Sequence, residues 1–317
     1  MRLLFGIWFM YKELLIIDLE EVIFMNKRFW GCVKALVILI LDGMLVQYYL
    51  FHDWCITFIV IGCITLYAFN ISEFFSTLKV GGVRLDKLDA LSRSKLRQGY
   101  EILKKQYYRT YGKELNLKVY LIPEDSFNAY AFGIKKIGIT SDALLCLDAN
   151  SIAGVLAHEV GHVIGLDVVI KRLLFINLLG LSLVLLISQV VWLLVVLLIC
   201  VGIAWLFNNC IGIYLSVGLL RGLTKISKGI FGVMLSLAQS FISLLDRSRE
   251  YSADSFACDL GFGFQLSFIL SRYVGETPPA RCISDLLYAT HPKTAKRVAR
   301  IEKKIEKERT QIINKKN

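Results

Sequence analysis

Two of the four histidines in this chain lie four residues apart, in the segment His158-Glu159-Val160-Gly161-His162. The apolar residues around this segment predict a helix, so the two imidazoles lie one turn apart on one face and both can reach a single Zn²⁺. Glu159 projects beside that face, where it can take a proton from a metal-bound water. Because a bare His-Glu-x-x-His also arises by chance, the rest of the sequence must supply further ligands.

A third ligand is expected, because catalytic zinc usually has three protein ligands and one open position. In the downstream segment 248–254, Glu250 and Asp254 form an i, i+4 pair on one helical face. Glu250 is the predicted third ligand, and Asp254 can accept the outer N–H of a ligating histidine. The alternative for Glu250, which follows Arg247 and Arg249 in the sequence, is a solvated charge pair.

The composition indicates that these residues belong to a membrane protein. Of the 317 residues, 56% are hydrophobic and only 20% are charged, which does not fit a water-soluble globule. The formal net charge of +11 could indicate nucleic acid binding, but cytoplasmic flanks of membrane spans collect the same charge, and we expect no nucleic acid partner. No two of the eight cysteines are spaced as Cys-x-x-Cys, which argues against a zinc ribbon and a thioredoxin-type redox site. Five of them lie in apolar stretches, where packed, reduced thiols are expected.

A first pair of spans is predicted over residues 29–71. Phe29 to Phe51 is apolar except for Lys34 and Asp42, and the uncharged stretch from Trp54 to Ile71 follows after a short polar break. Basic residues flank both ends of this hairpin but not its turn, so the positive-inside rule places both ends in the cytoplasm. Asp42 lies near mid-depth and should face another helix.

A second pair of spans is predicted over residues 173–220. This run has no charged residue and no histidine, and as one helix it would extend ~72 Å, more than twice a ~30 Å hydrocarbon core. It should therefore turn back on itself. Residues 229–245 are predicted to form an amphipathic helix or, alternatively, a further span. Because His158 and Glu250 must share one metal, the number of crossings between them must be even.

The water-exposed regions, residues 79–165 and 246–317, together have the size of one domain. The pattern predicts an amphipathic helix from Val83 to Tyr111, ending at Gly112. A strand over 117–122 and a β-hairpin over 129–140 should follow, and then the histidine-bearing helix, capped by Asp148, Asn150 or Ser151.

Taken together, these motifs resemble the HtpX-like membrane zinc metallopeptidases of the gluzincin type. These are relatives of the CAAX prenyl endoproteases and the mitochondrial Oma-type proteases. The matching segments appear in the family's order and are Asn128–Gly133, Ile137–Thr140, Val155–His162, Arg247–Asp254, Thr290–Pro292 and Arg297.

The resemblance implies a role for each matching residue. His158, His162 and Glu250 would bind Zn²⁺, Glu159 would be the general base, and Asp254 would support a ligand. His291 and Arg297 would steady the oxyanion or the substrate carbonyl, although a His-Pro turn before a basic helix is also typical of a simple helix start. The strand that begins Asn128-Ala129-Tyr130 would pair with the substrate backbone.

The resulting prediction is a mainly α membrane protein with four transmembrane helices as two hairpins. A cytoplasmic α+β zincin-like catalytic domain with a small β-sheet accompanies them. The expected organisation is an N-terminal segment (1–28), a first hairpin (29–71), the first catalytic segment (79–165), a second hairpin (173–220), and a helix with the second catalytic segment (229–317).

The predicted function is that of a multi-pass zinc endopeptidase of the inner or plasma membrane. Its polypeptide substrates would be unfolded or damaged membrane proteins, cleaved in quality control at the cytoplasmic face. The alternatives are a CAAX-type prenyl protease, a non-catalytic membrane scaffold and, since Asp42 is an intramembrane acid, a transporter.

The first residues suggest a separate expectation about the start of the chain. Met25-Asn26-Lys27-Arg28 looks like a natural bacterial start, and Glu20-Glu21-Val22 could be encoded by a ribosome-binding sequence. Residues 1–24 are therefore expected to be an over-extended gene prediction, which N-terminal sequencing of the native protein would test.

Overall fold

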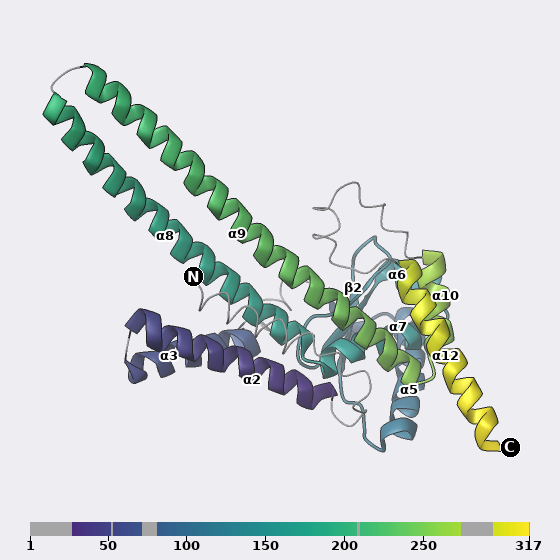
Figure 1. The fold of residues 1–317 in the computed structure, drawn as a ribbon. Helices are drawn as coiled ribbons and strands as arrows, with labels where there is room; N and C mark the ends of the chain where they lie inside the picture. The colour runs from purple at the N-terminus through teal and green to yellow at the C-terminus, as the bar shows by residue number, and fades with distance from the viewer. Residues whose placement is uncertain (1–26, 52, 72–80, 208–209, 274–293, 317) are drawn as a thin grey trace.

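The chain forms a long helical arm joined to a unit that contains a small sheet (Figure 1). The computed structural model describes residues 27–51, 53–71, 81–207, 210–273 and 294–316. These residues are mostly helical, with one four-stranded sheet. The elements are α2 (Lys27–Leu45), η1 (Val46–Phe51), α3 (Trp54–Leu66), η2 (Tyr67–Ile71), β1 (Val83–Arg84), η3 (Leu85–Lys87), α5 (Ala90–Tyr111), β2 (Lys118–Ile122), β3 (Ala129–Ala131), β4 (Lys136–Thr140), α6 (Ser141–Cys146), α7 (Ala149–Ile164), α8 (Asp167–Phe207), α9 (Cys210–Asp259), α10 (Gly263–Tyr273) and α12 (Thr294–Lys316).

The N-terminal hairpin consists of α2 and α3, and its turn is stabilised by Asp53. The carboxylate of Asp53 accepts hydrogen bonds from the backbone N–H groups of Cys55 and Ile56, which caps α3. On α2, the buried Asp42 accepts a 3.0 Å hydrogen bond from Asn177 Nδ2 of α8. The expectation that Asp42 faces another helix is therefore confirmed, and this bond ties the two hairpins together.

The same hairpin touches the bend between α7 and α8 through a glycine. A Cβ atom at Gly31 would overlap the carbonyl oxygen of Gly165, whereas a Cβ at Gly62 on α3 would meet nothing within 4 Å. We expect Gly31→Leu to destabilise the protein by about 1–3 kcal/mol, because overpacking forces the backbones apart. Thermal unfolding in detergent measures this, with Gly62→Leu as the matched control. Equal unfolding midpoints for the two variants would contradict the contact.

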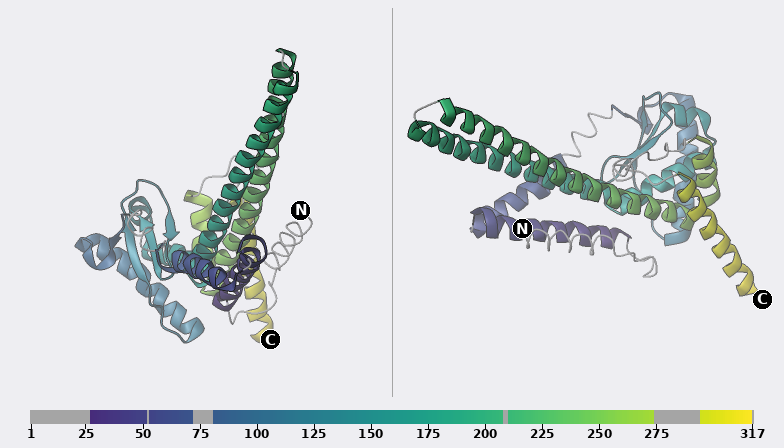
Figure 2. Two further views of the ribbon diagram at one scale, coloured as in Figure 1. Left: turned by 90° about the vertical axis from the view of Figure 1, so that its left-hand side faces the viewer. Right: turned by 45° about the horizontal axis from the view of Figure 1, so that its top comes forward.

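The long arm consists of α8 and α9, which lie side by side in every view and run in opposite directions (Figures 1 and 2). The prediction that residues 173–220 turn back on themselves is confirmed, because α8 ends at Phe207 and α9 begins at Cys210 and returns along it; the returning helix continues far beyond residue 220. Residues 229–245 lie within α9, which runs directly to Glu250. The position of the turn could not be predicted, because an evenly apolar run carries no signal for the point where the chain reverses.

Two helices of the described chain are long and apolar enough to cross a membrane, Phe29–Tyr48 and Leu186–Ile203. The apolar helix Trp54–Phe69 is shorter, and only 11% of the Leu186–Ile203 window is buried. Large side chains such as Leu198 and Trp205 are exposed around α8, as expected for a helix with lipid as its solvent. The four predicted spans are not confirmed; two candidate spans are present.

The sheet is mixed, with strand order β1-β2-β4-β3. The predicted hairpin is confirmed, because β3 pairs antiparallel with β4, while β2 pairs parallel with β4. The predicted helix from Val83 is wrong at its start: Val83 and Arg84 pair with β2, and α5 begins only at Ala90. Its predicted end is right, because Gly112 adopts a left-handed φ of 63° that favours glycine.

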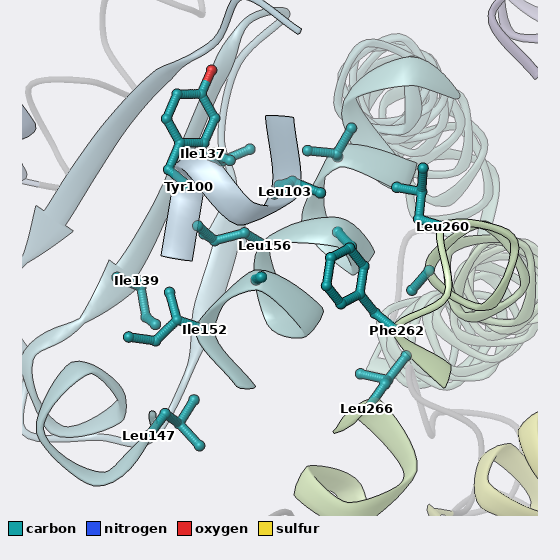
Figure 3. Close-up of a cluster of buried hydrophobic side chains, with 14 of the residues drawn as sticks. Tyr100, Leu103, Ile137, Ile139, Leu147, Ile152, Leu156, Leu260, Phe262 and Leu266 are labelled. Carbon is teal, nitrogen blue, oxygen red and sulfur yellow. The ribbon is translucent and has the colours of Figure 1, made fainter. Parts of the chain in front are cut away.

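One hydrophobic core joins the two water-exposed regions of the sequence. Figure 3 shows side chains from α5, β4, α7 and the connection between α9 and α10 meeting around α7. Ile152 and Leu156 of α7 are fully buried there, and Leu260 and Phe262 pack from the other region of the chain. The helix that carries the histidines is therefore held on several sides, which makes its position rigid.

Candidate metal centre

The helix α7 presents its two histidines to a common point. Its N-terminus is capped by Asp148, one of three candidates from the sequence, whose side chain accepts from the N–H of Ser151. His158 and His162 follow one turn apart, with their Nε2 atoms 3.2 Å from each other. The side chains of His158 and His162 are only 9% and 13% exposed, so their ring nitrogens are largely shielded from bulk water.

The helix α9 brings Glu250 to the same point from a distant region of the sequence. Its Oε2 lies 3.6 Å from His158 Nε2, and its Oε1 lies 3.7 Å from His162 Nε2. Glu250 is only 6% exposed, so the alternative of a solvated charge pair is wrong. The three side chains offer ligand atoms that all lie within 4.8 Å of one another.

The spacing and chemistry of these atoms fit a divalent cation such as zinc. Tetrahedral zinc with bonds of ~2.0–2.1 Å to nitrogen and oxygen places neighbouring ligand atoms roughly 3.3 Å apart. The two Nε2 atoms are 3.2 Å apart, and the two Glu250 oxygens lie 3.6 and 3.7 Å from one Nε2 each, which is close to that value. Two imidazoles and one carboxylate leave room for a fourth ligand, as in catalytic zinc sites.

The electrostatics of the cluster also favour a positive charge at this point. Burial lowers the pKa of His158, but the carboxylates of Asp254 and Glu250 outweigh burial and raise it to about 9. Burial raises the pKa of Asp254, yet His158 and Arg297 hold it below its ordinary value. The carboxylates therefore stabilise a cation between them, whether a proton or a metal ion.

Behind the ligands, Asp254 and Arg297 form a second layer of contacts. Asp254 Oδ1 lies 2.9 Å from His158 Nδ1, on the far side of the ring from the other ligand atoms. Arg297 of α12 donates two hydrogen bonds to Asp254, of 2.8 and 2.7 Å, and its Nη1 lies 3.0 Å from Glu250 Oε2. Arg297 thus faces two carboxylates, while His291 lies outside the described residues.

A carboxylate that the sequence reasoning missed stands behind the second histidine. Asp167, the first residue of α8, places Oδ2 2.7 Å from His162 Nδ1 and is only 7% exposed. It is the first charged residue after the histidine motif, five positions beyond His162 in an otherwise apolar stretch. That isolated charge was the available signal.

Glu159 and β3 complete the surroundings of the cluster. Glu159 is buried at 8% exposed next to His158, and it interacts electrostatically with Arg297. Within the described chain β3 has β4 as its one strand neighbour, so no described strand pairs with its other edge. Asn128 anchors this strand, because its backbone carbonyl accepts from Thr140 and its side chain donates to the Tyr130 hydroxyl.

Comparison with known proteins identifies one family. The model for peptidase family M48 matches residues 101–305, a region that contains both histidines and Glu250. None of the curated proteins compared with the chain matches it. The crystal structure of Ste24p from S. mikatae is similar with a TM-score of 0.43 and 18% identity, over 86% of this chain and 63% of that one. The chain therefore spans less than two thirds of the Ste24p chain.

Proposed function

The chain belongs to peptidase family M48, a family of metallopeptidases, and we propose that it is a zinc-dependent endopeptidase of the membrane. In this proposal His158, His162 and Glu250 bind the metal, and Glu159 is the general base. The observation that carries it is the convergence of three side chains from α7 and α9 whose ligand atoms all lie within 4.8 Å of one another. Three protein ligands with one open position are typical of a hydrolytic zinc site.

Bound at these three side chains, zinc would lower the pKa of a coordinated water from about 15.7 toward about 7 and polarise the substrate carbonyl. Glu159 follows His158 directly in α7, and its carboxylate accepts the proton of the attacking water. The same carboxyl group then returns the proton to the leaving amine nitrogen as the peptide bond breaks. Burial keeps bulk water from competing for Glu159.

Arg297 and Asp254 serve this chemistry as positioning residues. The contacts of the guanidinium with Glu250 and Asp254 hold the third ligand and the His158 ring in place. This differs from the oxyanion role that the resemblance implied for Arg297. The role of His291 at the substrate carbonyl stays a prediction.

The substrate is proposed to bind as an extended strand along β3. No described strand pairs with the outer edge of β3, which begins at Ala129, and β3 lies beside the helix that carries the histidines. Strand addition binds through backbone hydrogen bonds and depends little on side chains. It also requires an extended chain, which suits unfolded or damaged membrane proteins as substrates.

The domain arrangement and its orientation belong to the proposal as well. We place residues 79–165 and the end of α9 onward in one catalytic domain at the cytoplasmic face, because the basic flanks of the N-terminal hairpin favour that side. The hairpins would hold this domain at the inner or plasma membrane. Membrane proteins leaving the bilayer would then meet the β3 edge at once.

The test is zinc content and proteolysis measured on the same detergent-purified protein. We expect one zinc per chain, cleavage of an unfolded membrane protein, loss of cleavage on chelation and recovery on adding Zn²⁺. Zinc-dependent cleavage rules out a non-catalytic scaffold, whereas metal-free protein with no cleavage would contradict the proposal. Cleavage of a prenylated peptide in preference to the unfolded protein would favour the CAAX-type alternative.

A further inference from the structure

The residue that stands behind His162 belongs to the membrane arm. Asp167 is the first residue of α8, and its Oδ2 lies 2.7 Å from Nδ1 of the imidazole. A carboxylate accepts at this distance, so Nδ1 carries the hydrogen and the lone pair of Nε2 points toward His158 and Glu250. Each histidine thus has a carboxylate at its outer nitrogen, Asp254 for His158 and Asp167 for His162.

The backbone between the two helices is shaped to aim Asp167 at the ring. Helix α7 and the beginning of α8 meet at a bend of 52°. Leu166 makes this bend with a left-handed φ of 55°, which is costly for a residue with a branched side chain and persists only where packing enforces it. The contact of Gly31 with Gly165 supplies such packing, because α2 presses directly on the bend.

Positive side chains from two other helices balance the buried carboxylate. Arg249 of α9 places Nε 3.9 Å from Asp167 Oδ1 and pairs with Asp246 at 2.9 Å. Lys34 of α2 interacts electrostatically with both Asp167 and Arg249. A buried carboxylate is retained only where such partners compensate its desolvation. Helices α2 and α9 therefore both help to keep Asp167 of α8 beside His162.

We propose that Asp167 is the positioning residue for the second zinc ligand: it fixes the tautomer and orientation of His162 through the bond to Nδ1. This inference rests on the proposed zinc site. It makes the first turn of α8 part of the metal centre, because Asp167, which begins the membrane arm, holds His162 in the last turn of α7. A competing role for an acidic first residue is to stabilise the helix N-terminus, which would affect folding and not zinc affinity.

The experiment is a Zn²⁺ titration of the full-length protein in detergent, in competition with a chromophoric chelator. We expect Asp167→Ala to weaken zinc binding by about 10–100-fold, the usual effect of losing the hydrogen-bond partner of a ligand. Asp167→Asn should lose less, because its amide oxygen still accepts from Nδ1 without the charge. The matched control is Asp148→Ala, which removes the N-terminal cap of α7, the helix that carries both histidines, and should lower thermal stability without changing the zinc Kd.

Each outcome decides the question. A zinc Kd for Asp167→Ala within about threefold of wild type, or an equal loss in Asp148→Ala, would overturn the positioning role, because the ligand effect is expected to be at least about tenfold. If Asp167→Ala does not fold, Asp167→Leu, which fills nearly the same space but has no acceptor for Nδ1, decides alone, and a zinc Kd equal to that of wild type overturns the inference. Wild-type protein that binds no zinc would instead overturn the proposed function itself.

Discussion

Glu159→Gln is expected to stop proteolysis while the protein keeps its zinc. The amide has nearly the same shape as the carboxylate, so the buried site should fold unchanged, but it cannot accept a proton from water. General acid–base catalysis contributes about 10²–10⁴-fold to a rate, and kcat should fall by that much. The measurement is cleavage of an unfolded membrane protein alongside a metal assay on the same sample.

Two further variants make this prediction specific. Glu159→Asp keeps the base but withdraws it by one methylene, so it should retain some of the activity. Glu101→Gln removes a surface carboxylate on α5 that pairs with Lys104, and should behave as wild type. Equal cleavage by wild type and Glu159→Gln would remove Glu159 from the mechanism while leaving the fold and topology intact.

Glu250→Gln is expected to have the opposite pattern, with zinc lost together with activity. The carboxylate is one of three ligand atoms and also faces Arg297 at 3.0 Å, so its charge serves both the metal and the guanidinium. The loss of zinc affinity should exceed the roughly 10–100-fold that follows removal of a residue behind a ligand. Zinc titration and proteolysis on the same preparation measure both effects.

The control for this variant is Glu302→Gln, an exposed glutamate on α12, the helix that carries Arg297. It should bind zinc and cleave substrate as wild type does. Full zinc occupancy of Glu250→Gln at micromolar protein would show that a different group supplies the third ligand. The contrast between Glu159→Gln, which keeps zinc, and Glu250→Gln, which loses it, separates the base from the ligand.

Much of the local structure could be predicted because its signals lie within a few residues. The pairing of β3 with β4 follows from alternating residues around Lys135, and the end of α5 follows from Gly112. The approach of His158 to His162 follows from helical geometry alone, since residues four apart share a face. The start of α5 was missed because β1 forms only by pairing with β2, which is a long-range contact.

The course of the membrane arm shows where such reasoning stops. Residues 173–220 are apolar throughout, so every position satisfies the bilayer equally and none marks a reversal. The structure places the reversal after Phe207, where α8 ends and α9 returns along it. Only contacts between the two helices, such as that of Gln189 with the carbonyl of Ser227, set their alignment.

The metal centre shows the same division between features set by local sequence and features set by long-range packing. Residue type and spacing alone predicted that His158 and His162 share a helical face that could hold a metal ion, with Glu159 beside it, because a helix converts sequence distance directly into spatial distance. The sequence also predicted Glu250 as the third ligand, but only the tertiary structure shows that it reaches the histidines, that Arg297 contacts Glu250 and Asp254, and that Asp167 turns back to His162. These contacts depend on how distant helices pack and on the bend at Leu166, neither of which is written in any short stretch of the chain.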